Sequence, residues 1–195
     1  MPRSLPQFRV LHGLPADLRT AAAALYWRHF GAQLLPLPAG HRRGMALVRR
    51  ALRPEHALVA LSPQGRLIGI AGLRDARGGL LAHDPQSFRA VWGDARGRLC
   101  HLSTGLYRPG PQTADLVIDG IAIRHDWRRQ GIARALVEAA ARHARARGHA
   151  ALRAEVAADN PEALAAWRAM GFIRQSRHRL GWPWMRPAHV LRLTL

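Results

Sequence analysis

A stripe of apolar side chains with helical spacing is the clearest pattern in this chain of 195 residues. Its members lie three and four residues apart, so they predict one amphipathic helix, which Gly148 ends. Asn160 and Pro161 predict the start of another helix, because Asn is a favourable N-cap and Pro suits the first helical position. This second helix is expected to run to Met170. The stripe consists of Ile132, Ala135, Leu136, Ala139, Ala140 and His143.

Short apolar runs between turn residues predict the strands of a sheet. Residues 57–62 and 67–73 flank the turn residues 63–65, so the two runs predict a hairpin. These runs alternate with helical segments, which predicts a single α/β domain over residues 1–195, long enough to bury a sizeable core. Further strands are expected at 8–12, 114–123, 152–156, 172–179 and 190–195, and further helices at 15–30 and 42–51.

A longer segment, residues 80–112, separates the third predicted strand from the fourth. Phe88, Val91, Trp92 and Leu99 recur there with helical spacing, although two intervening glycines weaken a helix. Two interpretations stay open at this point. The segment is either an accessory helix that packs on the core or a wall of a substrate pocket.

Composition narrows the class of protein. The chain has no apolar run of membrane-spanning length, and its first residues lack the apolar region of a signal peptide, so a cytoplasmic protein is expected. Cys100 is the only cysteine, which excludes an internal disulfide and a cysteine-cluster metal site. A small buried hydrophobe is a better interpretation of this cysteine than a catalytic thiol.

The formal net charge of +18 raises the question of a nucleic-acid partner. All 30 basic residues are Arg, however, and they are spread along the chain without a basic tail or block. A basic surface that attracts a polyanionic cofactor is therefore favoured over nucleic-acid binding.

The most informative segment for chemistry lies between residues 118 and 134. An apolar run leads into a short basic turn and then directly into the amphipathic helix, an order that suits phosphate binding by free N–H groups. Arg128, Gly131 and Ala133 fit the pattern Arg/Gln-x-x-Gly-x-Gly/Ala. This segment resembles the pyrophosphate loop of the GNAT superfamily of N-acetyltransferases. Dinucleotide-binding and Walker loops are excluded, since the chain has no Gly-x-Gly-x-x-Gly and no Lys.

A second segment carries the same resemblance. Asn160, Ala163, Trp167, Gly171 and Phe172 match the positions of the family signature Asn-x-x-Ala-x-x-x-Tyr-x-x-x-Gly-Phe, with Trp in place of Tyr. The two segments occur in the family's order, and the resemblance spans residues 114–172. It implies a GNAT-like α/β fold, with a mixed central sheet of six or seven strands, helices on both faces, and splayed fourth and fifth strands. Residues 80–112 would be an insertion in this fold.

The resemblance also implies acetyl-CoA as co-substrate, with no metal. The strand before the loop would pair with the pantetheine arm, the loop would wrap the pyrophosphate, and the amide near Ile121 would polarise the thioester carbonyl. Asn160 would contact the cofactor in addition to capping its helix. The cofactor-binding residues implied are Ile121, Ala122, Ile123, Arg128, Arg129, Gln130, Gly131, Ile132, Ala133, Arg134 and Asn160.

Two carboxylates are candidates for the catalytic base. Glu155 lies five residues before Asn160, as does the catalytic glutamate of ribosomal-protein-alanine N-acetyltransferases, and Asp119 is the competing candidate. Either carboxylate has the alternative of a structural ion pair with Arg. The family's usual general acid is a Tyr at the position of Trp167, whose indole cannot donate a proton at working pH. Tyr107, Tyr26 or solvent would supply that proton instead.

The resemblance predicts an N-acetyltransferase in which the amine of a small molecule or peptide attacks acetyl-CoA directly in a ternary complex. The alternatives are acetylation of a macromolecule, such as aminoacyl-tRNA or a protein N-terminus, and a non-catalytic CoA-binding module. No membrane partner is expected, and a homodimer is compatible with all three. Trp182 and Trp184 are expected either to close the core or a dimer contact, or to form an apolar wall for the acceptor.

Overall fold

The computed structural model describes residues 8–36 and 39–195. Its strands are β1 (Arg9–His12), β2 (Ala57–Leu61), β3 (Leu67–Arg74), β4 (Leu116–Ile123), β5 (Ala151–Ala157), β6 (Ile173–His178) and β7 (Ala188–Thr194). Its α-helices are α1 (Arg19–Leu34), α2 (His41–Ala51), α3 (Pro85–Trp92), α4 (Asp94–Ser103), α5 (Ile132–Ala146) and α6 (Pro161–Ala169). The mixed α/β fold predicted from the sequence is confirmed.

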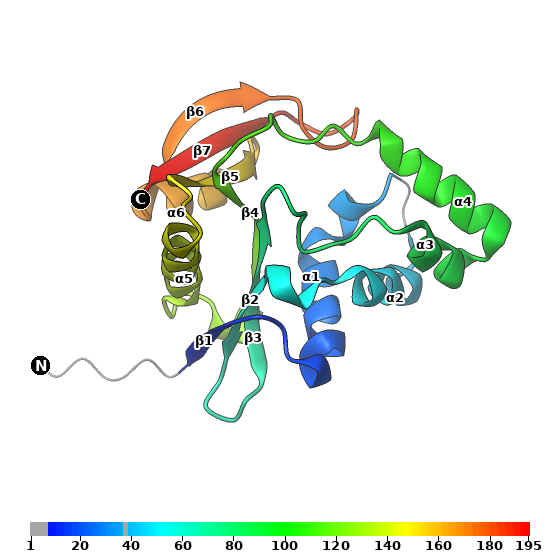
Figure 1. Ribbon diagram of the computed structural model, residues 1–195, viewed down its shortest axis with the longest axis horizontal. Coiled ribbons are helices and arrows are strands. Elements are labelled where there is room, and N and C mark those ends of the chain that lie inside the picture. Colours follow the sequence, from blue (N-terminus) through cyan, green and yellow to red (C-terminus); the bar gives the residue numbers. More distant parts are fainter. Residues whose placement is uncertain (1–7, 37–38) are drawn as a thin grey trace, which may run out of the picture.

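The strands form one sheet in the order β1-β2-β3-β4-β5-β7-β6. Neighbouring strands are antiparallel except β4 and β5, which are parallel. Parallel neighbours need a crossover connection, and α5 supplies it. Figure 1 shows α5 and α6 on one side of the sheet and α1 and α2 on the other.

Each face of the sheet buries its own apolar cluster. On the α5 side, Leu136 and Ala140 from the predicted stripe pack against Leu152 and Leu191 of the sheet. On the other side, the α1 and α2 side chains cover residues such as Val59 and Ile70. Strands β2 and β3 are buried on both faces, which explains why their sequences are apolar without alternation.

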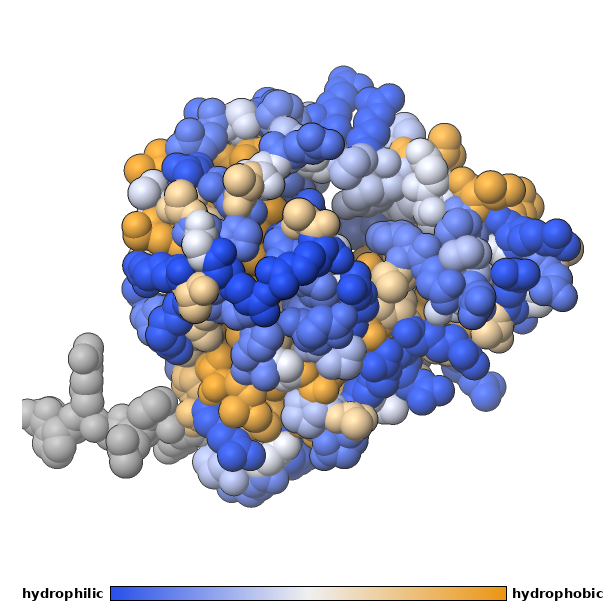
Figure 2. Space-filling model, viewed as in Figure 1, coloured by the Kyte–Doolittle hydropathy of each residue, from blue (hydrophilic) through white to orange (hydrophobic). Residues whose placement is uncertain are grey.

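The segment between β3 and β4 differs from the single helix that its spacing predicts. Gly93 adopts a positive φ of 81° and ends α3, so two short helices form instead of one. Phe88 of α3 is buried in the core, whereas Leu99 of α4 is 68% exposed. The two helices form a lobe at one end of the molecule, and Figure 2 shows the surface hollowed between this lobe and the rest of the protein.

None of the helices in the described part of the chain has both the length and the apolar character to cross a bilayer.

Candidate active site

The open end of the β4–β5 pair is the centre of the candidate site. Pairing between the two strands ends at Ile118 and Ala154, so within the described ranges the rest of β4 has no strand neighbour on that side. A register shift between Gly72 and Leu73 of β3 leaves Asp119 without a partner on the other side too. The splayed strands predicted from the family resemblance are therefore present, and a β-bulge lies where they separate.

Two residues of β4 direct their backbone groups into this wedge. The Arg124 N–H donates to the Ile68 carbonyl oxygen of β3, at 2.9 Å. Successive residues of a strand point their N–H groups to opposite sides, so Ile121 and Ile123 turn theirs away from β3. Ala122 points back to β3, and its side chain is buried on the α1 side of the sheet. The structure thus brings Ile121 and Ile123 to the wedge, but not Ala122.

The turn between β4 and α5 presents free N–H groups beside open space. Gly131 is the N-cap of α5 in the left-handed conformation, with a φ of 80°, and no atom would lie within 4 Å of a Cβ built on it. The first bond of the helix runs from the Ala135 N–H to the Gly131 carbonyl oxygen, so the N–H groups of residues 132–134 have no acceptor inside the helix. This arrangement fits an anionic phosphate group, whose charge the N-terminal end of the helix dipole also favours.

Arg129 in the same turn is strained. Its φ of 59° is the only positive value at a non-glycine residue in the described ranges. Such a conformation is sparsely populated for residues with a Cβ, and it tends to persist where function requires it.

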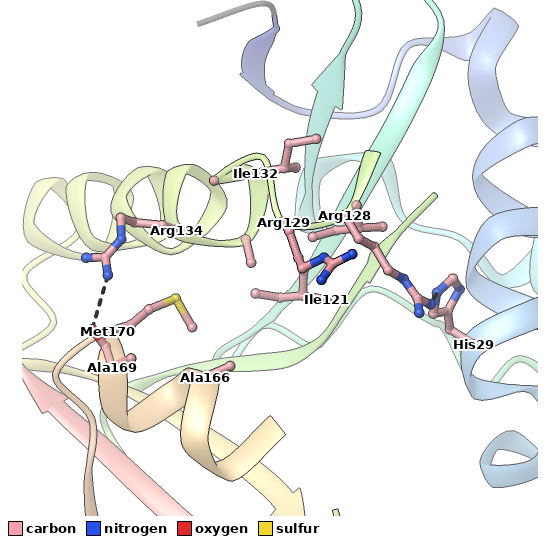
Figure 3. A pocket seen from close by; sticks show the side chains of 12 residues that line it. His29, Ile121, Arg128, Arg129, Ile132, Arg134, Ala166, Ala169 and Met170 are labelled. Carbon is pink, nitrogen blue, oxygen red and sulfur yellow. Dashed lines mark hydrogen bonds between the residues drawn. The ribbon is translucent and has the colours of Figure 1, made fainter. Parts of the chain in front are cut away.

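A cavity of about 460 Å³ lies between this turn, the wedge and α6 (Figure 3). Most of the predicted cofactor-binding residues line it: Ile121, Ile123, Arg128, Arg129, Gly131, Ile132, Ala133 and Arg134. Four further lining residues carry no sequence signal for a cofactor: His29, Ala166, Ala169 and Met170.

Besides Ala122, two of the predicted residues lie outside the lining. The Gln130 side chain donates to the Asp126 carbonyl oxygen, at 3.3 Å. Asn160 caps α6, its Oδ1 accepting from the Ala163 N–H at 3.0 Å. The structure therefore confirms the capping role of Asn160 and leaves its cofactor contact a prediction.

Arginines from two sides close over the cavity. Arg134 donates to the Ala169 carbonyl oxygen at 3.1 Å and so joins α5 to the end of α6. Arg128 reaches across to α1, where its Nη2 lies 3.0 Å from Nε2 of His29. Figure 3 shows both contacts at the edges of the cavity.

The two candidate bases lie together, in a cluster with two arginines. The Arg74 Nε donates to Oδ1 of Asp119 at 2.7 Å, and its Nη2 lies 3.7 Å from Oε1 of Glu155. Arg153, which is almost fully buried, donates to the same Glu155 oxygen at 2.5 Å and to the Pro111 carbonyl oxygen at 2.6 Å. Glu155 is thus held mainly by Arg153, whereas Arg74 is the only described residue that binds the Asp119 side chain.

Electrostatics distinguishes Asp119 further. Burial raises the pKa of its carboxyl above the ordinary value of 3.8, and the Arg74 guanidinium offsets part of that rise. The charge of Glu155 raises it as well. A carboxyl with a raised pKa is a stronger base once it is ionised.

Two tyrosines face the same cluster. Burial raises the pKa of Tyr26 on α1, and the charge of Asp119 adds to the rise. Burial also raises the pKa of Tyr107, followed in size by the charge of Glu155. Trp167, in contrast, is buried in the core against the edge of Phe172, with ring centroids 4.7 Å apart. The two hydroxyls thus lie near the carboxylates, where the family's helical Tyr is missing.

The connection before β4 and the β6–β7 loop are joined by backbone hydrogen bonds beside Tyr107. Arg108 and Gly181 exchange two backbone hydrogen bonds, of 2.9 and 2.8 Å. Beside them the Tyr107 ring packs edge-on against Trp182, whose Nε1 donates to the Gln33 carbonyl oxygen of α1 at 2.9 Å. Three elements far apart in sequence therefore form one wall.

Comparison with known proteins identifies the family. The sequence model of the Acetyltransferase (GNAT) family matches residues 21–172. The chain belongs to the GNAT family. No curated protein matches this GNAT chain by sequence.

Solved structures share its fold at low sequence identity. An N-acetyltransferase from Staphylococcus aureus Mu50 is 17% identical, with 95% of this chain and 100% of that chain covered and a TM-score of 0.68. The NatC complex bound to Gag peptide and CoA gives 17% identity, coverage of 97% and 99%, and a TM-score of 0.59. The ribosomal-protein-S18-alanine N-acetyltransferase from Escherichia coli gives 18% identity, coverage of 96% and 93%, and a TM-score of 0.53.

Acetyl-CoA is the cofactor that the GNAT family uses, and the residues of this GNAT chain fit its diphosphate. The free N–H groups after Gly131, the open space beside that glycine and the arginines around the cavity supply donors and positive charge. The described residues include no group of three or more His, Cys, Asp and Glu placed to hold a metal ion.

Proposed function

We propose that this GNAT protein is an acetyl-CoA-dependent N-acetyltransferase that acts on the amine of a small molecule or peptide by direct attack in a ternary complex. One observation carries the proposal. Where β4 separates from β5, its residues Ile121 and Ile123 line the cavity, and Asp119 of the same strand belongs to the Asp119–Arg74–Glu155 cluster. A donor thioester held in the cavity and an acceptor amine at the carboxylate cluster would therefore meet at the wedge.

The residues at the wedge have separate tasks. The loop from Arg128 to Arg134 would hold the diphosphate, and Ile121 and Ile123 would pair with the pantetheine arm. When bound, acetyl-CoA supplies the acetyl thioester, whose carbonyl carbon forms the new bond to nitrogen as the carbon–sulfur bond breaks. The Ile121 N–H, turned into the wedge, offers a donor for the oxygen on which negative charge develops.

Asp119 is the better base of the two candidates on this geometry. It stands on the bulge at the point where the strands separate, and one of its oxygens has no hydrogen-bond partner among the described residues. Its raised pKa suits the acceptance of a proton from an ammonium group. Glu155, bound by two arginines, would then orient Arg74 and the acceptor rather than take the proton.

Tyr107 and Tyr26 are the candidate acids for the departing thiolate. Both hydroxyls lie near the carboxylates, and their raised pKa values keep them protonated at neutral pH. Tyr107 is the more accessible of the two, because its residue is 44% exposed while Tyr26 is buried.

Ligand binding and turnover test the proposal in two steps. Acetyl-CoA at millimolar concentration should raise the melting temperature by mass action on the native state. A panel of amines and N-terminal peptides, assayed by release of free CoA thiol, should then contain at least one acceptor. No thermal shift of the folded protein would contradict the assignment, and a shift without turnover would indicate a CoA-binding module.

The net charge of +18 favours one second candidate, an acceptor amine carried on a polyanionic macromolecule such as aminoacyl-tRNA. The same assay with aminoacyl-tRNA tests it directly. Acetylation of that RNA-linked amine, inhibited by moderate salt, would support this candidate over a small acceptor.

A further inference from the structure

His29 of α1 lies on the cofactor side of the wedge, although nothing in its local sequence marks a binding residue. It lines the same cavity as Arg128, from which it is 99 residues distant in the chain. The Nη2 atom of Arg128 lies 3.0 Å from Nε2 of the His29 ring. Figure 3 shows the Arg128 side chain extended from the loop to this ring.

The contacts of His29 determine which ring nitrogen accepts. Its Nδ1 lies 3.0 Å from the Leu25 carbonyl oxygen, which can only accept, so Nδ1 carries the proton. The guanidinium of Arg128 can only donate, so Nε2 is the acceptor. Both bonds are satisfied by one neutral tautomer, with the ring held to the backbone of its own helix.

The helix that carries His29 is itself anchored. Phe30, the next residue, lies against Gly120 of β4, where a Cβ built on that glycine would come within 2.7 Å of the Phe30 ring. One turn further along α1, the Gln33 carbonyl oxygen accepts from Trp182. His29 therefore presents its acceptor from a fixed position relative to the wedge.

We propose that His29 is a positioning residue for the diphosphate group of the cofactor and acts through Arg128. The inference rests on the proposed function, since it takes the loop after β4 as the diphosphate site. The free Arg side chain has several rotatable bonds whose freedom would be lost on binding a phosphate. Holding Nη2 on His29 removes part of that loss beforehand and leaves the other guanidinium N–H groups for the ligand.

A double-mutant cycle with CoA as the probe tests the inference. His29→Leu removes the acceptor and should raise the dissociation constant of CoA, measured by calorimetry, by about threefold to tenfold. His29→Gln retains an acceptor, so its dissociation constant for CoA should be closer to that of the native protein. In an Arg128→Ala background the effect of His29→Leu should shrink to less than about twofold, because the two residues share one interaction.

Arg134 provides the matched control, since it lines the same cavity and bonds to α6 instead of His29. The effects of His29→Leu and Arg134→Ala on CoA affinity should add. Acetyl-pantetheine, which lacks the diphosphate, should retain its kcat/KM in His29→Leu relative to the native protein. An equal loss of kcat/KM with acetyl-CoA and with acetyl-pantetheine would show a merely structural role for His29.

Each remaining outcome decides the question. Additivity of His29→Leu with Arg128→Ala would overturn the inference, as would tighter CoA binding by His29→Leu, which would make His29 a competitor for Arg128. If Arg128→Ala leaves CoA affinity unchanged, the diphosphate does not contact Arg128, so the loop assignment fails together with the inference. If Arg128→Ala weakens CoA binding and His29→Leu does not, the loop assignment stands and the inference alone fails.

Discussion

The left-handed backbone conformation of Gly131 leads to a prediction about CoA binding. Gly148 serves as its control. Gly148, after the C-terminal end of α5, has nearly the same φ, 77° against 80°, and equally open surroundings. Ala at either position should lower the free energy of unfolding by about 1 kcal/mol, from backbone strain alone. Calorimetry should show weaker CoA binding only for Gly131→Ala, because only that methyl group occupies the phosphate space. Equal CoA affinity in both variants would place the phosphate elsewhere.

The raised pKa of Asp119 predicts a pH dependence of turnover. The carboxyl can accept a proton only when ionised, so kcat/KM should increase as the pH rises through this pKa, which lies above the ordinary value of 3.8. Asp119→Asn should lower kcat by about a hundredfold or more and remove this acidic limb. CoA affinity should not change.

Glu155→Gln is the parallel variant for this test. Because Glu155 is already bound by Arg153 and Arg74, the change should alter the KM of the acceptor more than the shape of the pH profile. Loss of the acidic limb in Glu155→Gln, with the limb intact in Asp119→Asn, would make Glu155 the base.

At the scale of elements, local patterns in the sequence predict α5, α6 and the turn before α5 well. The apolar stripe, the Asn160–Pro161 start and the glycine at 131 are signals contained in a few consecutive residues. Two contacts of the site have no such local signal: Arg74 with Asp119, and Arg128 with His29. The partners are 45 and 99 residues apart in the chain, and only the packed fold brings them together. Local sequence patterns therefore do not predict such contacts.

The two tryptophans of the β6–β7 loop, which look equivalent in sequence, have different surroundings. Trp182 is 2% exposed and bonded to α1, while Trp184 is 61% exposed and stacks on Trp182 with centroids 6.0 Å apart. Trp182→Ala should lower the free energy of unfolding by about 3–5 kcal/mol, because it leaves a cavity in the wall of the cleft. Chemical denaturation measures this loss.

Trp184→Ala should change the free energy of unfolding by less than about 0.5 kcal/mol, as an exposed substitution. If Trp184 contacts the acceptor, this variant should raise the acceptor KM and leave the KM of acetyl-CoA unchanged. If the acceptor KM of Trp184→Ala equals that of the native protein, the loop has only a structural role, which it exerts through Trp182.

At the scale of the whole molecule, 30 basic and 12 acidic residues give a formal net charge of +18, and Arg128, Arg129 and Arg134 line the cavity. Ion pairs in the described part use only some of the chain's arginines, and hydrophilic side chains cover much of the face seen in Figure 2. A net positive charge attracts an anionic ligand from a distance. Salt weakens this attraction, because the Debye length falls from about 10 Å at 0.1 M to about 3 Å at 1 M.

Association of CoA should therefore slow with ionic strength. Between low and high salt, we expect the association rate constant to fall by about tenfold, with a smaller change in dissociation, because steering acts before contact. Stopped-flow tryptophan fluorescence measures both rates. Pantetheine, which has no phosphate, is the matched control, and its association should be nearly independent of salt. Equal salt dependence for the two ligands would show that salt acts on the protein itself, and that the surface charge of this GNAT chain serves a partner other than its cofactor.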